Sequence, residues 1–124
     1  MRYMIIVKAS ADSEAGVMPQ SELFDRMGAY HEELARAGVL LDAAGLKPSR
    51  EGWRIAYRAG KPTPVTDGPF AESKELIAGY TLIQVRSRDE ALEWTRRFPS
   101  PHPRDEVEIE VRPLFEAEDF AHLT

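Results

Sequence analysis

His31 and Asp67 are the two residues of this chain whose types best suit acid/base chemistry. A histidine titrates near neutral pH, and a neighbouring carboxylate holds its tautomer and raises its pKa. If the chain is an enzyme, we therefore expect His31 to act as general base and Asp67 to orient it, within one cleft. Structural roles stay open for both residues: a half-buried histidine at a helix edge, and a carboxylate that caps a turn.

Other kinds of reactive site find little support in the sequence. The three histidines lack the spacing of a metal site, and the absence of cysteine excludes disulfides, thiolate metal ligands and a cysteine nucleophile. No stretch resembles a nucleotide-binding loop or a serine triad. We therefore predict neither a metal nor a cofactor.

The stretch Asp67-Gly68-Pro69-Phe70 is the most constrained part of the chain. Pro69 fixes its own φ and keeps the preceding residue out of the helical region, so the chain must turn here. Asp67 is expected to accept a hydrogen bond from the backbone of Phe70 or Ala71. The candidate ligand-binding set joins this turn to charged neighbours that could line a mouth for a small anionic ligand: Arg54, Arg58, Gly68, Pro69, Phe70, Glu72 and Lys74. Solvated surface charge is the alternative for each charged member.

Apolar periodicity predicts the elements that must position these residues. In chain order they are a strand over 2–8, a helix from Pro19 to Gly38, a strand from Val39, a hairpin over 53–67, a strand over 77–85, a helix behind Ser87 and a strand over 107–112. This order is the split β-α-β arrangement of a ferredoxin-like α+β sheet, with both helices on one face and the hairpin inserted.

The strand over 77–85 has apolar residues on both of its faces. Thr81, Ile83 and Val85 share one face, and Tyr80 and Leu82 share the other. Because one helix layer covers only one face, the second face needs a partner; burying a large apolar side chain contributes roughly 1.5–3 kcal/mol. We therefore predict a homodimer.

The turn and its surroundings resemble the YCII-related proteins of the DGPF type, the YciI-like family. The residues that carry the resemblance are the turn with Ala71-Glu72-Ser73-Lys74-Glu75, the strand Ile77 to Val85, the opening Arg2-Tyr3-Met4-Ile5-Ile6-Val7-Lys8, the helix end Glu33-Leu34-Ala35-Arg36-Ala37-Gly38-Val39-Leu40, the segment Asp89-Glu90-Ala91-Leu92-Glu93-Trp94 and the closing Glu110-Val111-Arg112-Pro113. Nearly the whole chain is covered. The resemblance implies a dimeric α+β barrel, in a family mostly of unassigned function in which a His and an Asp are thought to act together.

Size and charge limit the remaining possibilities. The 124 residues predict a single domain over 1–124, in which 113–124 form a C-terminal tail. A formal net charge of −5 argues against nucleic-acid and anionic-membrane partners. No signal-type N-terminus or long apolar run is present, so the cytoplasm is the expected location.

Two functions from different classes follow. The first is a non-catalytic small-molecule-binding or regulatory dimer, and the second is a small-molecule enzyme of lyase or isomerase type that uses His31 and Asp67. The resembling family commonly has another Asp after the second helix, where this chain has Phe98-Pro99. That difference favours the binding module, while enzymatic activity stays an open question.

Overall fold

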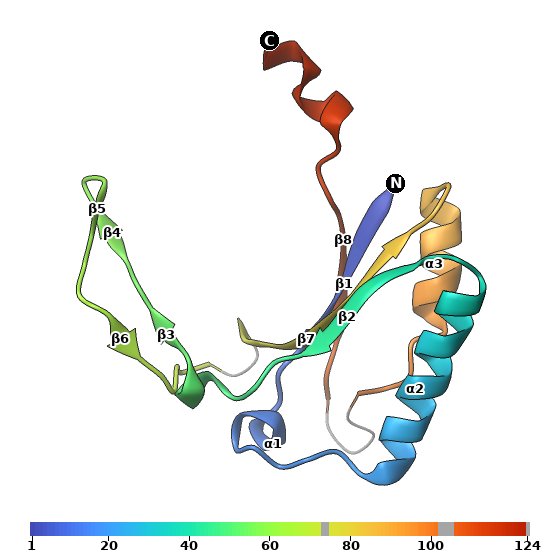
Figure 1. Ribbon diagram of the computed structural model, residues 1–124. Coiled ribbons are helices and arrows are strands. Elements are labelled where there is room, and N and C mark those ends of the chain that lie inside the picture. The colour runs from blue at the N-terminus through green and yellow to red at the C-terminus, as the bar shows by residue number, and fades with distance from the viewer. Residues whose placement is uncertain (73–74, 102–105, 124) are drawn as a thin grey trace.

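A computed structural model describes residues 1–72, 75–101 and 106–123 (Figure 1). Helices α2 (Ser21–Arg36) and α3 (Arg88–Arg96) cover one face of a four-stranded sheet. The strands of this sheet are β1 (Arg2–Lys8), β2 (Leu40–Gly45), β7 (Ile77–Gln84) and β8 (Ile109–Pro113). The shorter elements are α1 (Ala11–Glu14), the 3₁₀ turns η1 (Ser49–Glu51) and η3 (Ala117–Leu123), and the strands β3 (Trp53–Arg54), β4 (Tyr57–Arg58), β5 (Lys61–Pro62) and β6 (Thr66–Asp67).

The sheet has the strand order β2-β7-β1-β8, and all neighbouring strands are antiparallel. The chain therefore forms two β-α-β units, β1-α2-β2 and β7-α3-β8, whose strands interleave. This topology is consistent with the predicted ferredoxin-like α+β fold. The dimer and the barrel stay predictions.

The core lies between the sheet and the two helices. It is built from side chains that are at most 7% exposed: Tyr3, Ile5, Tyr30, Leu34, Val39, Ile83, Val85 and Ala91. Strand β7 has the predicted alternation, because Thr81, Ile83 and Val85 are buried while Tyr80 and Leu82 on the other face are half-buried. Figure 1 shows that, among the described elements, no helix covers this second face. We call it the open face.

Local signals place the ends of both helices near their predicted positions. Helix α2 stops just before Gly38, whose φ of +74° lies in the left-handed region that glycine tolerates. Helix α3 starts directly after Ser87, whose hydroxyl accepts a 3.1 Å hydrogen bond from the Glu90 N–H. The Glu90 carboxylate accepts from the Arg86 N–H at 3.0 Å, one residue before the position that a regular capping box would use.

The predicted hairpin forms a narrow ribbon, which we call the arm (residues 53–67). Strand β3 pairs with β6 at its base and β4 pairs with β5 near its tip. The tip turns at Ala59-Gly60, where both residues have positive φ. The arm projects from the main sheet on the side opposite α2 and α3 (Figure 1).

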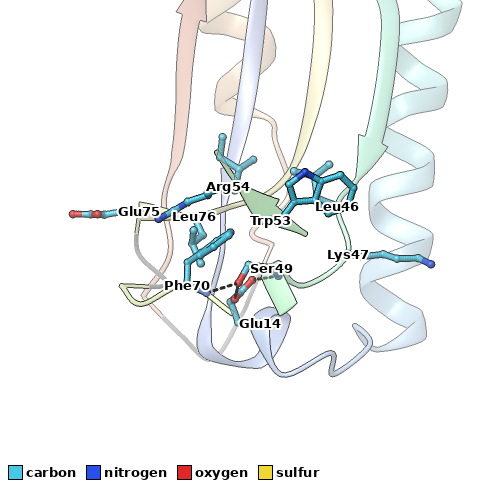
Figure 2. A pocket seen from close by; sticks show the side chains of 10 residues that line it. Glu14, Leu46, Lys47, Ser49, Trp53, Arg54, Phe70, Glu75 and Leu76 are labelled. Atoms are coloured by element: carbon cyan, nitrogen blue, oxygen red, sulfur yellow. Dashed lines mark hydrogen bonds between the residues drawn. The ribbon is translucent and has the colours of Figure 1, made fainter. Parts of the chain in front are cut away.

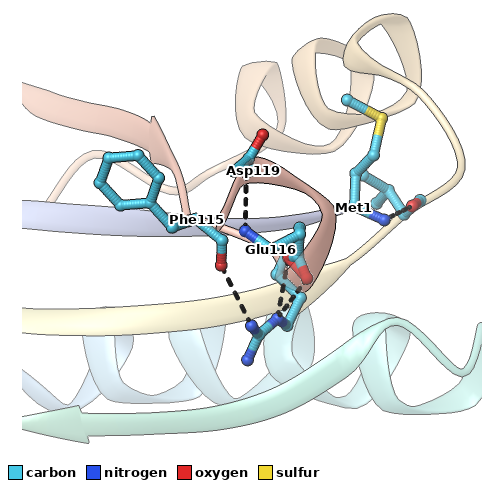
Figure 3. Close-up of polar contacts among 6 residues, drawn as sticks. Met1, Phe115, Glu116 and Asp119 are labelled. Carbon is cyan, nitrogen blue, oxygen red and sulfur yellow. Dashed lines mark hydrogen bonds and ion pairs between the residues drawn. The ribbon is translucent and has the colours of Figure 1, made fainter. Parts of the chain in front are cut away.

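The C-terminal segment is fastened to the first strand at its start (Figure 3). The Arg2 guanidinium donates to the Glu116 carboxylate at 3.0 Å and to the Phe115 carbonyl at 3.4 Å. Phe115 and Phe120 pack on each other with ring centroids 5.1 Å apart, and both are exposed. Within the described residues, no helix is both long and apolar enough to span a bilayer.

Candidate functional site

A cavity of about 350 Å³ lies at the base of the arm (Figure 2). Five segments meet there: α1, the connection after β2, β3, the Asp67–Phe70 turn and the start of β7. The lining residues are Glu14, Leu46, Lys47, Ser49, Trp53, Arg54, Phe70, Glu75, Leu76 and Ile77. Two members of the predicted ligand-binding set, Arg54 and Phe70, are thus brought together.

Ser49 joins three of these segments through one side chain and one peptide group. Its backbone N–H donates to Glu14 Oε1 at 2.9 Å, and its hydroxyl donates to Glu14 Oε2. The same hydroxyl accepts from the Phe70 N–H at 3.1 Å. Both oxygens of the Glu14 carboxylate are therefore used within the protein, and the turn is tied to α1 through η1 (Figure 2).

The prediction that the Asp67 carboxylate accepts a hydrogen bond from the Phe70 N–H is wrong, because this N–H donates to the Ser49 hydroxyl instead. Asp67 lies in β6, is exposed and pairs with Trp53 in the ladder of the arm. The single hydrogen of the Phe70 N–H is therefore used by Ser49 and not by the Asp67 carboxylate. Long-range packing thus replaces the local hydrogen bond.

Gly68 is confined by its neighbours and not by its own backbone conformation. Its φ is not in the left-handed region, but a Cβ at this position would lie 1.9 Å from the Ser49 carbonyl oxygen. Its N–H donates to the Gly52 carbonyl at 3.0 Å, and the peptide bond to Pro69 is cis. The turn and η1 are therefore packed backbone to backbone.

Arg54 supplies the cation of the cavity. Its guanidinium carbon lies 3.8 Å from the centroid of the Phe70 ring, which is within the range of a cation–π contact. No carboxylate among the described residues forms an ion pair with Arg54, whereas Lys47 lies 4.0 Å from Glu51. The side chains of Lys47 and Glu75 point outward in Figure 2. The donors of Arg54 are thus available to an anion in the cavity.

The other members of the predicted set are placed differently. Arg58 is exposed near the tip of the arm, away from the lining residues. Glu72 is exposed, with a φ of +63°, and does not line the cavity. Pro69 forms the turn itself, and Lys74 lies outside the described residues.

The structure does not bring His31 and Asp67 together. His31 lies on α2, and its Nε2 is 2.9 Å from the hydroxyl oxygen of Thr81, which is 2% exposed on the helix-covered face of β7. Asp67 belongs to the arm, on the other side of the sheet (Figure 1). Burial lowers the pKa of His31, the opposite of the rise that a carboxylate partner would cause. This environment fits the open alternative, a half-buried histidine at a helix edge.

Tyr30, the neighbour of His31 in α2, also forms a hydrogen bond within the chain. The Tyr30 hydroxyl donates to the Trp94 carbonyl at 2.8 Å, and burial raises the pKa of Tyr30 to about 12. The tyrosine therefore stays neutral and acts as a donor between α2 and α3. Within the described part of the chain, no group of three or more His, Cys, Asp or Glu side chains is arranged to hold a metal ion.

Glu14 and Ser49 have no part in the sequence-based site. They are separated by 35 positions, in connections whose composition predicts only loops. A Ser that follows a proline indicates a turn start, but nothing local indicates which carboxylate it will bind. Only the fold brings the two together.

Gly68→Ala is expected to destabilise the protein by about 1–3 kcal/mol, since the added methyl group must displace the backbone of Ser49. Gly28→Ala is the matched control, because a Cβ there meets nothing within 4 Å and Gly28 lies inside α2. That change should stabilise by roughly 0.5–1 kcal/mol. Urea denaturation measures both; equal effects would show that Gly68 is not confined by Ser49.

The His31 pKa should be the same in the parent protein and in Asp67→Asn, and it should lie below the value for unfolded histidine. With a depressed folded-state pKa, stability is fully present above the unfolded pKa of about 6.5 and is lost as pH falls through the folded value. An NMR titration of the His31 ring tests the first statement, and urea denaturation between pH 5 and 8 the second. A pKa that drops in Asp67→Asn would restore the acid/base pair.

Comparison with known proteins identifies the family of the chain. Residues 1–118 match the YCII-related domain. Over 88 residues the chain is 39% identical to an uncharacterized protein of Rhizobium meliloti (strain 1021), a match that covers 71% of this chain and 69% of that protein. A solved structure of 5-chloro-2-hydroxyhydroquinone dehydrochlorinase from Burkholderia phenoliruptrix AC1100, in complex with 2,5-dihydroxybenzoquinone, aligns with a TM-score of 0.47 at 12% identity, over 96% of this chain and 98% of that one. The first two matches show that the chain belongs to the YCII-related family, as the sequence of the turn and its surroundings predicted.

Proposed function

We propose that this protein is a dimeric, non-catalytic module that binds a small anionic molecule in the cavity at the base of the arm. The observation that carries the proposal is the guanidinium of Arg54, which is held against Phe70 and has no carboxylate partner among the described residues. A volume of about 350 Å³ lies at the lower end of the range of small-molecule sites.

The walls of the cavity indicate the chemistry of the ligand. Leu46, Trp53 and Leu76 offer apolar surface, while Arg54 offers N–H donors in a planar fork that matches a carboxylate. Both oxygens of the Glu14 carboxylate accept hydrogen bonds from Ser49, so Glu14 is held against Ser49 and is not an ion-pair partner of Arg54. A small carboxylate with an apolar body fits these walls best.

The alternative, an enzyme of lyase or isomerase type, has less support. It requires His31 and Asp67 in one cleft, but Thr81 occupies the hydrogen-bonding position next to His31 and the arm takes Asp67 to the other side of the sheet. A general base must reach the proton that it abstracts. Within one chain, His31 and Asp67 therefore do not line a common cleft.

The dimer is proposed from the open face of the sheet. Met4, Ile6, Tyr80 and Leu82 are only half-buried there, and they are bordered by the Lys8–Glu110 ion pair at 3.5 Å. A face with an apolar centre and a polar rim is typical of a protein–protein interface. Pairing two such faces would give the dimeric α+β barrel that the family resemblance implies.

Arg54→Ala should weaken the binding of benzoate, a probe with one carboxylate and an apolar ring. A hydrogen-bonded charge contributes about 1.5–3 kcal/mol, so we expect roughly a 10- to 100-fold loss of affinity. Amide chemical shifts of the parent protein should move at Leu46, Phe70 and Leu76 during the titration.

Arg96→Ala is the matched control, because it removes an exposed arginine at the end of α3, outside both the cavity lining and the arm. Its affinity for benzoate should equal that of the parent. Equal losses in both variants would indicate attraction to net charge alone, and an unchanged affinity in Arg54→Ala would refute this cavity as the site.

The native mass should be about 28 kDa by light scattering, twice the chain mass of 14.0 kDa. Leu82→Glu should give the monomer mass with an unchanged circular dichroism spectrum, because it places a charge at the centre of the open face. Phe24→Glu, on the exposed side of α2, is the control and should stay dimeric. A parent protein that remains at 14.0 kDa across micromolar concentrations would contradict the dimer.

A further inference from the structure

The arm exposes more apolar surface than its own two strands can bury. Trp53 is 63% exposed and Tyr57 is 68% exposed, and Ile55 between them is 42% exposed. These three exposed side chains follow one another at every second position of the outgoing half of the arm. Val65 adds a fourth exposed apolar side chain on the returning half. Single exposed apolar residues are ordinary, but a group of four on one ribbon indicates a contact surface.

The arm also has little internal support. It contains two ladders of two residue pairs each, joined by hydrogen bonds between Ala56 and Thr63. A two-stranded hairpin by itself is marginally stable in water, and stability generally requires packing against a further element. On the body of its own chain, the arm is anchored at its base, where Gly68 donates to Gly52. The tip therefore needs a surface from elsewhere.

Charge indicates what that surface is. The arm has three cations, Arg54, Arg58 and Lys61, and one carboxylate at its base, Asp67, which gives it a net charge of +2. Because the whole chain carries −5, the rest of the molecule carries −7. The net acidic body of a second copy would therefore complement the charge of the arm, whereas a nucleic acid or an anionic membrane would be repelled by the rest of the chain.

We propose that the arm of each chain packs against the body of a second copy, with Ile55 and Tyr57 buried and Arg58 and Lys61 facing acidic surface of that copy. This inference rests on the proposed pairing of open faces. The arm projects on the open side of the sheet (Figure 1), so a chain that pairs with the open face lies beside it. Each subunit then gives an arm and receives one, as two-fold symmetry requires.

Cross-linking from the arm tests the contact directly, since the chain has no cysteine of its own. Tyr57→Cys labelled with benzophenone maleimide should form a covalent dimer on irradiation, at concentrations where light scattering shows the dimer. Phe24→Cys, at a position 53% exposed on α2, is the matched control and should give at least tenfold less. Only monomer from the Tyr57 label, or equal yields from both labels, would overturn the proposal.

A charge reversal gives a second, independent measurement. The double variant Arg58→Glu and Lys61→Glu should weaken dimerisation at least tenfold at low salt, and the difference from the parent should shrink in 0.5 M NaCl. An unchanged dimer affinity would overturn the role of the arm while leaving the open-face dimer intact. If Leu82→Glu also remained dimeric, the proposed interface itself would fail. Labels on the arm that react with an added oligonucleotide or with anionic vesicles in preference to a second chain would likewise overturn it.

Discussion

The close packing of the Asp67–Phe70 turn against Ser49 is the constraint on which the base of the arm depends. The Ser49 carbonyl occupies the space where a Cβ of Gly68 would lie, and the Ser49 hydroxyl accepts from the Phe70 N–H. Through Glu14 the same residue is attached to α1. The chain enters the arm just after η1 and leaves it at this turn, so one contact fixes both ends of the ribbon. It also sets the position of Phe70, and therefore the surface on which Arg54 rests.

The two faces of the sheet have different chemical characters. On the helix side, polar groups are satisfied within the chain: His31 meets Thr81, and Tyr30 donates to Trp94. Burial there lowers the pKa of His31 and raises that of Tyr30, so both side chains are kept neutral near pH 7. The side that faces away from the helices carries the half-buried apolar residues and the projecting arm. The two surfaces proposed to contact a second chain, the open face and the arm, are therefore both on this second side.

Periodic patterns predicted the fold well because they report local burial. The alternation in β7, the stop at Gly38 and the start at Ser87 all depend on residues that are neighbours in sequence. The site was less predictable because it depends on contacts between distant segments. The composition of the turn indicated where the chain bends but not what it contacts, because the partner of Phe70 is 21 positions away and the partner of His31 is 50 positions away. The helical position of His31 at the border of the apolar face did predict its half-buried state.

Arg54 belongs to both the cavity proposed to bind a ligand and the arm proposed to contact a second chain. It belongs to β3, the first strand of the arm, and it also lines the cavity, where Phe70 holds its guanidinium. Trp53 has the same double position, because it lines the cavity and is the first of the exposed apolar residues of the arm. A ligand that engages Arg54 restrains β3, and a second chain that packs on the arm restrains the same strand. Whichever event comes first costs the conformational entropy of ordering β3, and the second event then costs less. Ligand binding and association of the arm should therefore favour each other.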